Sequence, residues 1–356
     1  MRFPRFTRRR FLRNLILFGG TLLGAAALKN HMASRPRFPI SDHCDGAQFF
    51  NPGTHVNRTW WDVLKWKRTS TASPWPETVA IDPPALPKAP LDGTVCATWI
   101  NHASVLLQTR HANILTDPVF SDRVSPLSWA GPKRVHPPAI AVEDLPDIHV
   151  ILLSHDHFDH CDQASLRHFA SLPHPPIVVT PLGNGALLRE FGFRDERIIE
   201  LDWWEAHEFA HGFHVRATPA RHWSNRVMGS RNRRLWSGFF LQVGGRTVYF
   251  TGDTAWDDFM FADIRKRCGE PDLALIPIGA YEPRWFMASQ HCNPAEAVRI
   301  HQTVGAVTSI GVHWGTFQLT DEEREAPPQA LEIAKEQASI PPASFQALAV
   351  GGSITV

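Results

Sequence analysis

A short apolar run that is followed at once by three histidines and three aspartates constrains this chain more than any other feature. The stretch LLSHDHFDHCD extends from Leu152 to Asp162, and its apolar residues predict a buried strand. Imidazole and carboxylate groups are metal ligands. A solvated loop would account for one such histidine, but not for the pattern H-x-H-x-D-H. We therefore expect a metal site at the end of this strand.

Three further polar residues come shortly after apolar segments. His222 follows FHVRATP, Asp253 follows TVYFTG, and His313 follows TSIGV. Loops at one edge of a β-sandwich can converge, so these side chains can meet the first cluster in one cleft. In an extended segment, His155 and His157 point the same way and can share one ion.

The remaining polar positions predict a second ion. A tight turn would bring Asp159 and His160 towards it. Adding His222 to the first ion and His313 to the second gives each ion three protein ligands, and the two oxygens of Asp253 can bridge them. This mixed set suits Zn²⁺, with iron or manganese as alternatives. A hydroxide held between two such ions is a nucleophile at neutral pH, but the pattern says nothing about the substrate.

The first 30 residues predict a targeting segment and not a part of the fold. Arg8 and Arg9 lie in TRRRFLR, which resembles a twin-arginine export signal, and a glycine-interrupted apolar stretch follows from Leu15 to Leu28. That stretch is short for a bilayer span and suits a signal peptide, and the alternative is an uncleaved membrane anchor. Either places the remainder of the chain on the periplasmic side of a bacterial inner membrane.

The rest of the chain divides into two parts. Residues 31–92 are rich in proline and predict an irregular wrapping segment, in which a short helix around Trp60–Trp66 is one expectation. Residues 93–356 alternate strands with helices: Gly244-Gly245 predicts a hairpin turn between two strands, and residues 294–304 predict a helix. Strands with interspersed helices favour two mixed sheets with helices on their outer faces.

Charge and cysteine content exclude two classes of protein. The net charge is +1 and no basic block occurs in the body of the chain, which argues against nucleic-acid binding. The five cysteines are widely spaced and form no CxxC pair, so neither a disulfide framework nor a zinc knuckle is expected.

Several motifs carry a likeness to a known family. SHDHFDHCD, GDT and the late histidine resemble the metallo-β-lactamase superfamily of dinuclear hydrolases. TDPVFSDRVSP, GPKR, TPARHW, IPIGAYEPRWFM and HWGTF together resemble the phospholipase D enzymes that hydrolyse N-acylphosphatidylethanolamine. The likeness extends from about Phe49 to beyond His313.

The resemblance implies a metallo-β-lactamase-like αββα sandwich, with two mixed sheets and outer helices, that holds two zinc ions. Its ligand set corresponds here to His155, His157 and His222 on one ion, Asp159, His160 and His313 on the other, and Asp253 shared between them. Asp159 and Asp253 would also take part in catalysis.

The resemblance also assigns residues around the ligands. Asp117 would support the site by hydrogen bonding, and the alternative is a turn residue before Pro118. His291 would contact phosphate or protonate the leaving group, and the alternative is loop packing before the following helix. Arg284 could bind a phosphate or form a structural ion pair with Glu282 or another acid.

Two further sets of residues have both a structural and a functional interpretation. His102, in WINHAS, is interpreted as a buried core histidine in preference to a residue that supports the site. Trp60, Trp61 and Trp66 are candidates for a lipid entrance, with core packing as the alternative.

The function that this implies is zinc-dependent hydrolysis of N-acylphosphatidylethanolamine-like lipids to phosphatidic acid and an N-acylethanolamine, through a metal-bridging hydroxide. A phospholipid substrate, a membrane surface and a homodimer are the implied partners. One alternative keeps the two metals but acts on a soluble phosphodiester or a phosphorylated lactone. Another is a non-catalytic protein of the cell envelope that binds zinc or lipid.

Overall fold

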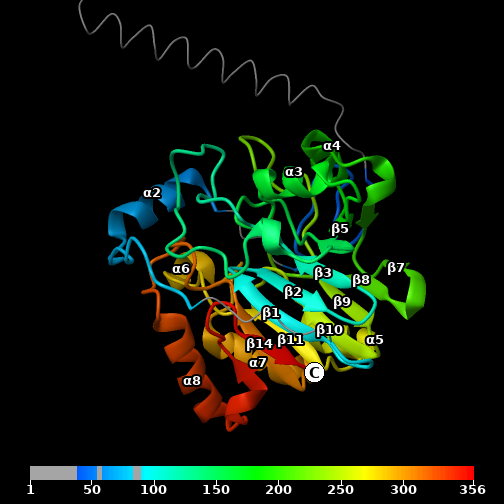
Figure 1. Ribbon diagram of the computed structural model, residues 1–356. Coiled ribbons are helices and arrows are strands. Elements are labelled where there is room, and N and C mark those ends of the chain that lie inside the picture. Colours follow the sequence, from blue (N-terminus) through cyan, green and yellow to red (C-terminus); the bar gives the residue numbers. More distant parts are fainter. Residues whose placement is uncertain (1–37, 54–57, 83–89) are drawn as a thin grey trace, which may run out of the picture.

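Two seven-stranded sheets form between Cys96 and Thr355 in the computed structural model, which describes residues 38–53, 58–82 and 90–356 (Figure 1). The first sheet has the order β14 (Ser353–Thr355), β1 (Cys96–Asn101), β2 (Ser104–Gln108), β3 (Asn113–Thr116), β4 (Val150–Leu152), β5 (Ile177–Pro181), β6 (Ile198–Leu201). The second has the order β13 (Phe345–Gln346), β12 (Thr308–Val312), β11 (Leu273–Pro277), β10 (Arg246–Phe250), β9 (Gly238–Val243), β8 (His214–Thr218), β7 (Ala206–Glu208).

Both sheets are mixed in the same way. In the first sheet the pairs from β14 to β3 are antiparallel and those from β3 to β6 are parallel. In the second sheet the pairs from β7 to β10 are antiparallel and those from β10 to β13 are parallel. The parallel halves are buried on both faces, as such strands usually are.

Alternation along the strands divides the core into layers. Ala97 and Trp99 of β1 belong to the large cluster between the two sheets, whereas Ile100 belongs to a second cluster on the outer face of the first sheet. In β4, Val150 and Leu152 face inwards, and Ile151 faces outwards. This is the period of two that a strand buried on both faces requires.

Helices cover the two outer faces, and Figure 1 shows them on opposite sides of the sandwich. Helices α3 (Gln163–Ser171) and α4 (Gly185–Phe191) pack on the first sheet through side chains such as Phe169 and Leu188. Helices α5 (Met260–Cys268) and α7 (Pro294–Val304) pack on the second sheet, and α8 (Ala326–Ala338) lies against α7. The predicted αββα sandwich is confirmed.

Local signals account for the element ends. Asn293 caps α7 by accepting from the backbone N–H of Glu296, and Gly305 ends the helix in the left-handed conformation. The turn between β9 and β10 places both Gly244 and Gly245 at positive φ, as the predicted hairpin requires.

The described part of the N-terminal region contains a helix where a short helix was expected. Residues 1–37 lie outside the described residues, and with them the predicted signal or anchor. Within 31–92, the described part contains helix α2 (Trp60–Thr69), which the capping box of Thr59 and Asp62 begins. Among the residues that the structure describes, no helix combines the length and apolar character needed to cross a bilayer.

Residues 38–53 are anchored on the loops after β5 and β6. Phe49 packs in a buried cluster with Trp203 and Trp236. His43 stacks on Trp203, with ring centroids 4.3 Å apart, and its two ring nitrogens lie 2.6 Å from Asp42 Oδ1 and 2.7 Å from Asp202 Oδ1. Burial lowers the pKa of His43, but the hydrogen bonds to Asp202 and Asp42 outweigh burial and raise it above 6.5.

This anchor makes stability depend on pH in a defined direction. A histidine whose pKa is raised in the folded state stabilises the fold fully below its unfolded pKa, and this contribution disappears as the pH rises through the folded pKa. We expect the stability advantage of the natural chain over His43→Gln to be largest at pH 6 and to shrink above it. Urea unfolding of both proteins at several pH values measures this, and a difference that stays constant or grows with pH would contradict it.

Candidate metal centre

The ligand-bearing loops meet because the strands that precede them end at one edge of the sandwich. Strands β3 and β4 are parallel neighbours. In the second sheet β8 and β10 are both antiparallel to β9, and β12 has the direction of β10. The residues that follow these strand ends are Asp117 after β3, the segment 155–160 after β4, His222 after β8, Asp253 after β10 and His313 after β12.

Three imidazoles meet on one side of the site. His157 Nδ1 lies 2.8 Å from His155 Nε2 and 3.1 Å from His222 Nε2. The other nitrogen of His222, Nδ1, lies 2.9 Å from the carbonyl oxygen of Gln290 and therefore donates to it. A neutral imidazole carries one proton, so Nε2 of His222 presents a lone pair to the other two rings.

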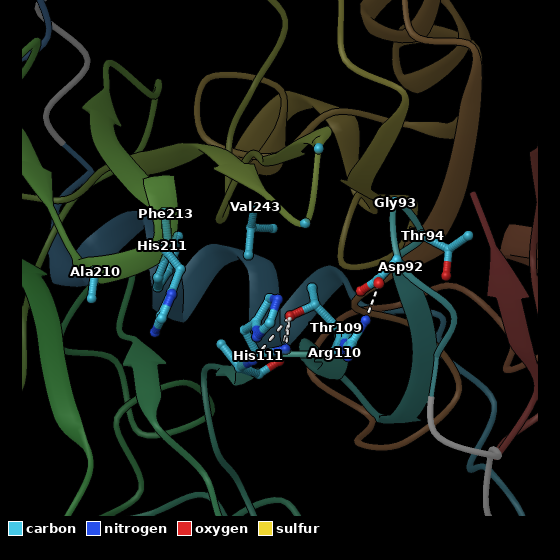
Figure 2. A pocket seen from close by; sticks show the side chains of 13 residues that line it. Asp92, Gly93, Thr94, Thr109, Arg110, His111, Ala210, His211, Phe213 and Val243 are labelled. Carbon is cyan, nitrogen blue, oxygen red and sulfur yellow. Dashed lines mark hydrogen bonds and ion pairs between the residues drawn. The ribbon is translucent and has the colours of Figure 1, made fainter.

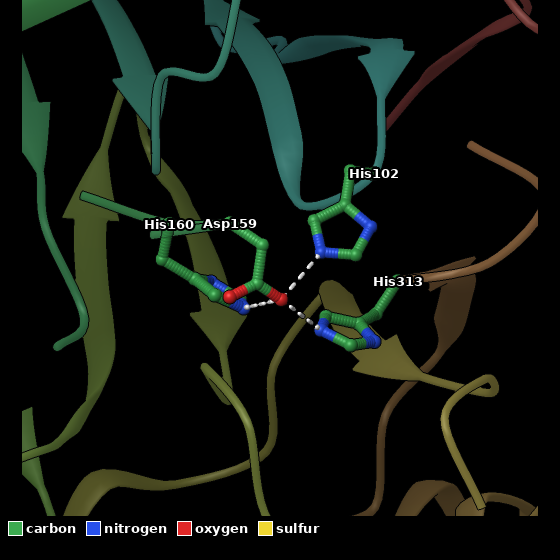
Figure 3. Close-up of side chains that lie close together, drawn as sticks. All are labelled: His102, Asp159, His160 and His313. Carbon is green, nitrogen blue, oxygen red and sulfur yellow. Dashed lines mark hydrogen bonds and ion pairs between the residues drawn. The ribbon is translucent and has the colours of Figure 1, made fainter. Parts of the chain in front are cut away.

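Two carboxylates and two imidazoles meet on the other side. Asp253 Oδ2 lies 3.1 Å from His160 Nε2 and 3.2 Å from His313 Nε2. Asp159 Oδ2 lies 3.3 Å from His313 Nε2 and 3.5 Å from His160 Nε2. Figure 3 shows the Asp159 carboxylate between these rings. Asp253 Oδ2 is also 3.9 Å from His155 Nε2, so this carboxylate lies between the two groups.

The donor set fits metal ions. Ring nitrogens of His157, His160 and His313 are buried and have no hydrogen-bond partner within the described chain. Lone pairs buried against one another are unfavourable unless a cation lies between them. His155, His157 and His222 form one group whose ligand atoms lie within 4.8 Å of one another, and Asp159, His160 and His313 form a second together with His102. Nitrogen and carboxylate oxygen are the ligands that zinc, iron and manganese accept.

Burial sets the protonation of the first group. It lowers the pKa of His157 to about 4 and that of His222 to about 3, and it lowers the pKa of His155 well below 6.5. Neighbouring imidazoles lower the pKa of His155 further. The three rings are therefore neutral at pH 7, which is the form that binds a metal.

Carboxylates set the protonation of the second group. Burial lowers the pKa of His313, but Asp253 and Asp159 outweigh burial and raise it to about 9. Burial likewise opposes a proton on His160, and three carboxylates raise its pKa well above 6.5. The carboxylates thus favour positive charge at this position, which a metal ion would supply.

Asp117 holds two ligand residues in place. Its Oδ2 lies 2.6 Å from His160 Nδ1, and its two oxygens accept from the backbone N–H and the hydroxyl of Ser154 at 2.7 and 2.6 Å. The Ser154 hydroxyl lies 2.8 Å from His155 Nδ1. Asp117 also has a φ of 30° directly before Pro118, so it combines the turn and the supporting interpretation.

The two remaining candidates lie beside this centre. His291 Nδ1 is 4.0 Å from Asp253 Oδ2, and His291 forms a potential ligand group with His222 and Asp253. Arg284 forms an ion pair with Glu296 at 2.7 Å and donates to the carbonyl oxygen of His291 at 3.0 Å. Of the two interpretations of Arg284, the structure supports the ion pair.

One residue beside the site was interpreted only in part from the sequence. His102 is buried, as expected, but its Nε2 lies 3.1 Å from Asp159 Oδ2, and its ring centroid lies 4.0 Å from that of His313 with the two rings tilted by 43° (Figure 3). It follows β1 directly, as the other site residues follow their strands. That position directly after a strand was the sequence signal from which its place in the site could have been inferred.

A pocket of about 220 Å³ lies at the opposite end of the strands and is unrelated to this centre (Figure 2). It is lined by the β2–β3 turn at Thr109–Ala112 and by the β9–β10 turn at Gly244-Gly245. Asp117 and Asp253 follow the other ends of β3 and β10. The cavity therefore does not contribute to the candidate site.

Comparison with known proteins agrees with this geometry. The β-lactamase superfamily domain matches residues 112–314, which carry every candidate ligand. The chain belongs to the metallo-β-lactamase superfamily.

Within the superfamily, the chain is similar to two enzymes of the predicted branch. It is 42% identical over 233 residues to N-acyl-phosphatidylethanolamine-hydrolyzing phospholipase D 1 of Caenorhabditis elegans, which is 64% of this chain and 65% of that protein. It is 34% identical over 253 residues to the mitochondrial enzyme of that name from Saccharomyces cerevisiae, which is 69% of this chain and 53% of that protein. The matched region thus spans between about half and two thirds of these relatives.

Solved structures of the superfamily share the fold. The isothiocyanate hydrolase from Delia radicum gut bacteria superposes with a TM-score of 0.56 at 19% identity, over 73% of this chain and 98% of that chain. Igni18, a metallo hydrolase from Ignicoccus hospitalis, superposes with a TM-score of 0.54 at 19% identity, over 74% and 98%.

In this member of the superfamily, two ligand segments are clamped together. The buried carboxylate of Asp156 accepts from the backbone N–H of Asn225 and pairs with Arg234, both at 2.9 Å. Arg226 donates to the carbonyl oxygens of Asp156 and Cys161 at 2.9 and 2.8 Å. The loop that follows His222 therefore fixes both ends of the segment that contains His157 and His160.

The clamp predicts a large effect from a small substitution. Asp156→Asn keeps the size of the side chain but removes the charge that Arg234 faces. Hydrogen bonds to charged groups contribute roughly 1.5–3 kcal/mol, so we expect a loss of that order in the free energy of unfolding. Urea unfolding measures it. Asp263→Asn, which breaks an exposed ion pair with Arg267, is the control and should cost about 0.5 kcal/mol or less. Equal losses of stability in the two variants would contradict the proposed role of Asp156.

Proposed function

We propose that this chain is a metal-dependent phosphodiesterase of the phospholipase D type. The proposed reaction converts N-acylphosphatidylethanolamine-like lipids into phosphatidic acid and an N-acylethanolamine. The observation that carries the proposal is the convergence of buried imidazoles and carboxylates into two adjacent ligand groups that share Asp253. The names of the nematode and yeast relatives support the choice of substrate.

We assign His155, His157 and His222 to one ion, and Asp159, His160 and His313 to the other, with Asp253 between them. Zinc is the proposed metal, with iron and manganese as alternatives. Ions bound in such a site polarise a phosphoryl oxygen and generate a nucleophile from water at neutral pH.

The reaction is a hydrolysis with a simple balance. A water oxygen forms a bond to phosphorus, the bond from phosphorus to the ethanolamine oxygen breaks, and that oxygen takes up a proton. His291 is the side chain placed to take part: it lies beside Asp253, and its Nδ1 has no hydrogen-bond partner in the described chain. We assign it to contact with the phosphate or to protonation of the leaving oxygen.

The test combines metal content with product analysis. The purified chain, with its metal content determined, is mixed with N-acylphosphatidylethanolamine in detergent micelles, and the products are identified by mass spectrometry. We expect about two metal ions per chain and release of N-acylethanolamine. His155→Ala should lose both metal and product, because it removes a ligand. His174→Ala, which changes an exposed histidine on another loop, should lose neither.

Other outcomes assign the chain differently. Two metal ions without N-acylethanolamine would contradict the lipid substrate and favour a soluble phosphodiester or a phosphorylated lactone. If Asp253→Asn left the turnover of every tested phosphodiester unchanged, the catalytic proposal would fail and a non-catalytic metal protein would remain.

We propose that helix α2 binds the surface of an anionic phospholipid bilayer. Trp60 and Trp61 are 63% and 62% exposed and stack on each other, and three basic residues follow them on the same helix (Lys65, Lys67, Arg68). Exposed indole rings next to basic side chains suit the interface of such a bilayer. Trp66 instead packs against Phe286, so its role is structural. Phe286 belongs to α6 (Arg284–Met287), which directly precedes the loop of His291.

The double substitution Trp60→Ala and Trp61→Ala should weaken binding to vesicles that contain phosphatidylglycerol. Each lost indole contact removes apolar burial, and about 1.4 kcal/mol corresponds to tenfold, so we expect roughly tenfold weaker binding or more. Vesicle sedimentation measures it. Phe259→Ala removes a still more exposed aromatic ring outside α2, which is 82% exposed, and should bind as the natural chain does. Equal binding by the double variant would rule out this surface.

A further inference from the structure

A histidine that is not among the proposed ligands faces the carboxylate of one of them. His102 lies in the turn between β1 and β2, and its side chain is 1% exposed. Its Nε2 lies 3.1 Å from Asp159 Oδ2, and Figure 3 marks this contact with a dashed line. Its Nδ1 is buried and has no hydrogen-bond partner among the described residues. The contact with Asp159 is thus the polar contact that this ring makes within the described chain.

The backbone holds His102 in one orientation relative to the site. Its N–H donates to Thr316 Oγ1 at 2.9 Å, and its carbonyl oxygen accepts from the N–H of His313 at 2.8 Å. Its φ is 44°, in the left-handed region that non-glycine residues adopt at a cost of roughly 1–3 kcal/mol. The β1–β2 turn of the first sheet is therefore hydrogen-bonded to the loop of the second sheet that contains His313 and Thr316.

The roles of the three rings around Asp159 can be separated. His160 already donates from Nδ1 to Asp117, so its Nε2 offers a lone pair. His313 lies with Nε2 close to both Asp159 and Asp253, as expected of a ligand that shares an ion with them. His102 is near Asp159 but is not paired with Asp253 in the structure. It is therefore the ring in position to donate a proton to the carboxylate.

We propose that His102 is a positioning residue: its Nε2–H donates to Asp159 Oδ2 and fixes the orientation in which this carboxylate binds the second ion. The proposal rests on the proposed metal centre but not on the identity of the lipid. Carboxylate ligands in metal sites are themselves commonly held by hydrogen bonds, and loss of such a partner typically weakens metal affinity 10- to 100-fold.

Two substitutions of similar polarity separate this role from a general effect on folding. His102→Gln places its amide nitrogen at about the distance of Nε2 from the backbone, so it can still donate to Asp159. His102→Asn is one methylene shorter and cannot reach. Zn²⁺ is titrated into the metal-free full-length chain in competition with a chromophoric chelator, which gives a separate dissociation constant for each ion.

We expect His102→Asn to bind the second ion about 10- to 100-fold more weakly, with the first ion unchanged, and His102→Gln to recover most of the loss. The control is His301→Gln. His301 is a buried histidine of α7 that is hydrogen-bonded to Ser309, and its substitution should change neither dissociation constant.

Three results would overturn the proposal. If His102→Asn bound both ions like the natural chain, His102 would be a core residue. If His102→Gln bound the second ion as weakly as His102→Asn does, the His102 ring would act as a direct ligand and not as a hydrogen-bond donor. If the natural chain itself bound fewer than two ions, the proposed metal centre would fail together with the role of His102.

Discussion

The structure depends on charged groups and imidazole lone pairs that are buried together at one edge of the sandwich. Asp253 is 4% exposed and lies against five imidazole rings. Two of these, His155 and His222, each have a ring nitrogen about 3 Å from His157 Nδ1. Without a cation, such an arrangement costs several kcal/mol for each uncompensated group. A fold that brings these residues together must therefore be stable enough to assemble the centre, and a metal ion bound there would contribute directly to that stability.

The sandwich holds these residues in place because each of them lies on a loop that follows a rigid strand. Both sheets change from antiparallel to parallel pairing near their middle, so the ends of β3, β4, β10 and β12 open on one edge. The backbone turns sharply after these strands, where Asp117 and His313 both have positive φ. Gly252, which precedes Asp253, has a φ of 60°, and a side chain at this position would lie 2.7 Å from the carbonyl oxygen of Ser237. Strained backbone of this kind persists only where its surroundings fix it.

Much of this could be predicted from the sequence because the relevant signals are local. The apolar run before His155 and the alternation that flanks Gly244-Gly245 predicted the strands, and the polar residues shortly after each strand identified the candidate ligands. The grouping of those ligands followed from the period of a strand and from the geometry of a sandwich edge. The helix over residues 294–304 followed from its cap at Asn293 and from Gly305 beyond its end.

The parts that could not be predicted depend on contacts between segments far apart in the sequence. His102 is 57 residues from Asp159, and nothing in WINHAS shows that its turn reaches the loop after β4. Asp156 and Arg234 are 78 residues apart, so the clamp on the ligand loop has no local pattern. An ion pair with Glu282 or another acid was one of two alternatives for Arg284, and its partner is Glu296 on helix α7, 12 residues away.

X-ray absorption spectroscopy of the zinc-loaded chain tests the proposed centre most directly. We expect a first shell of nitrogen and oxygen only, with histidine scattering and a metal–metal distance of about 3.5–4 Å, because the converging side chains are imidazoles and carboxylates that share Asp253. Zinc–sulfur scattering near 2.3 Å would contradict the centre, since it would place the metal on cysteines that lie outside the proposed ligand groups. A spectrum without metal–metal scattering, from a chain loaded with two equivalents of zinc, would also contradict the centre.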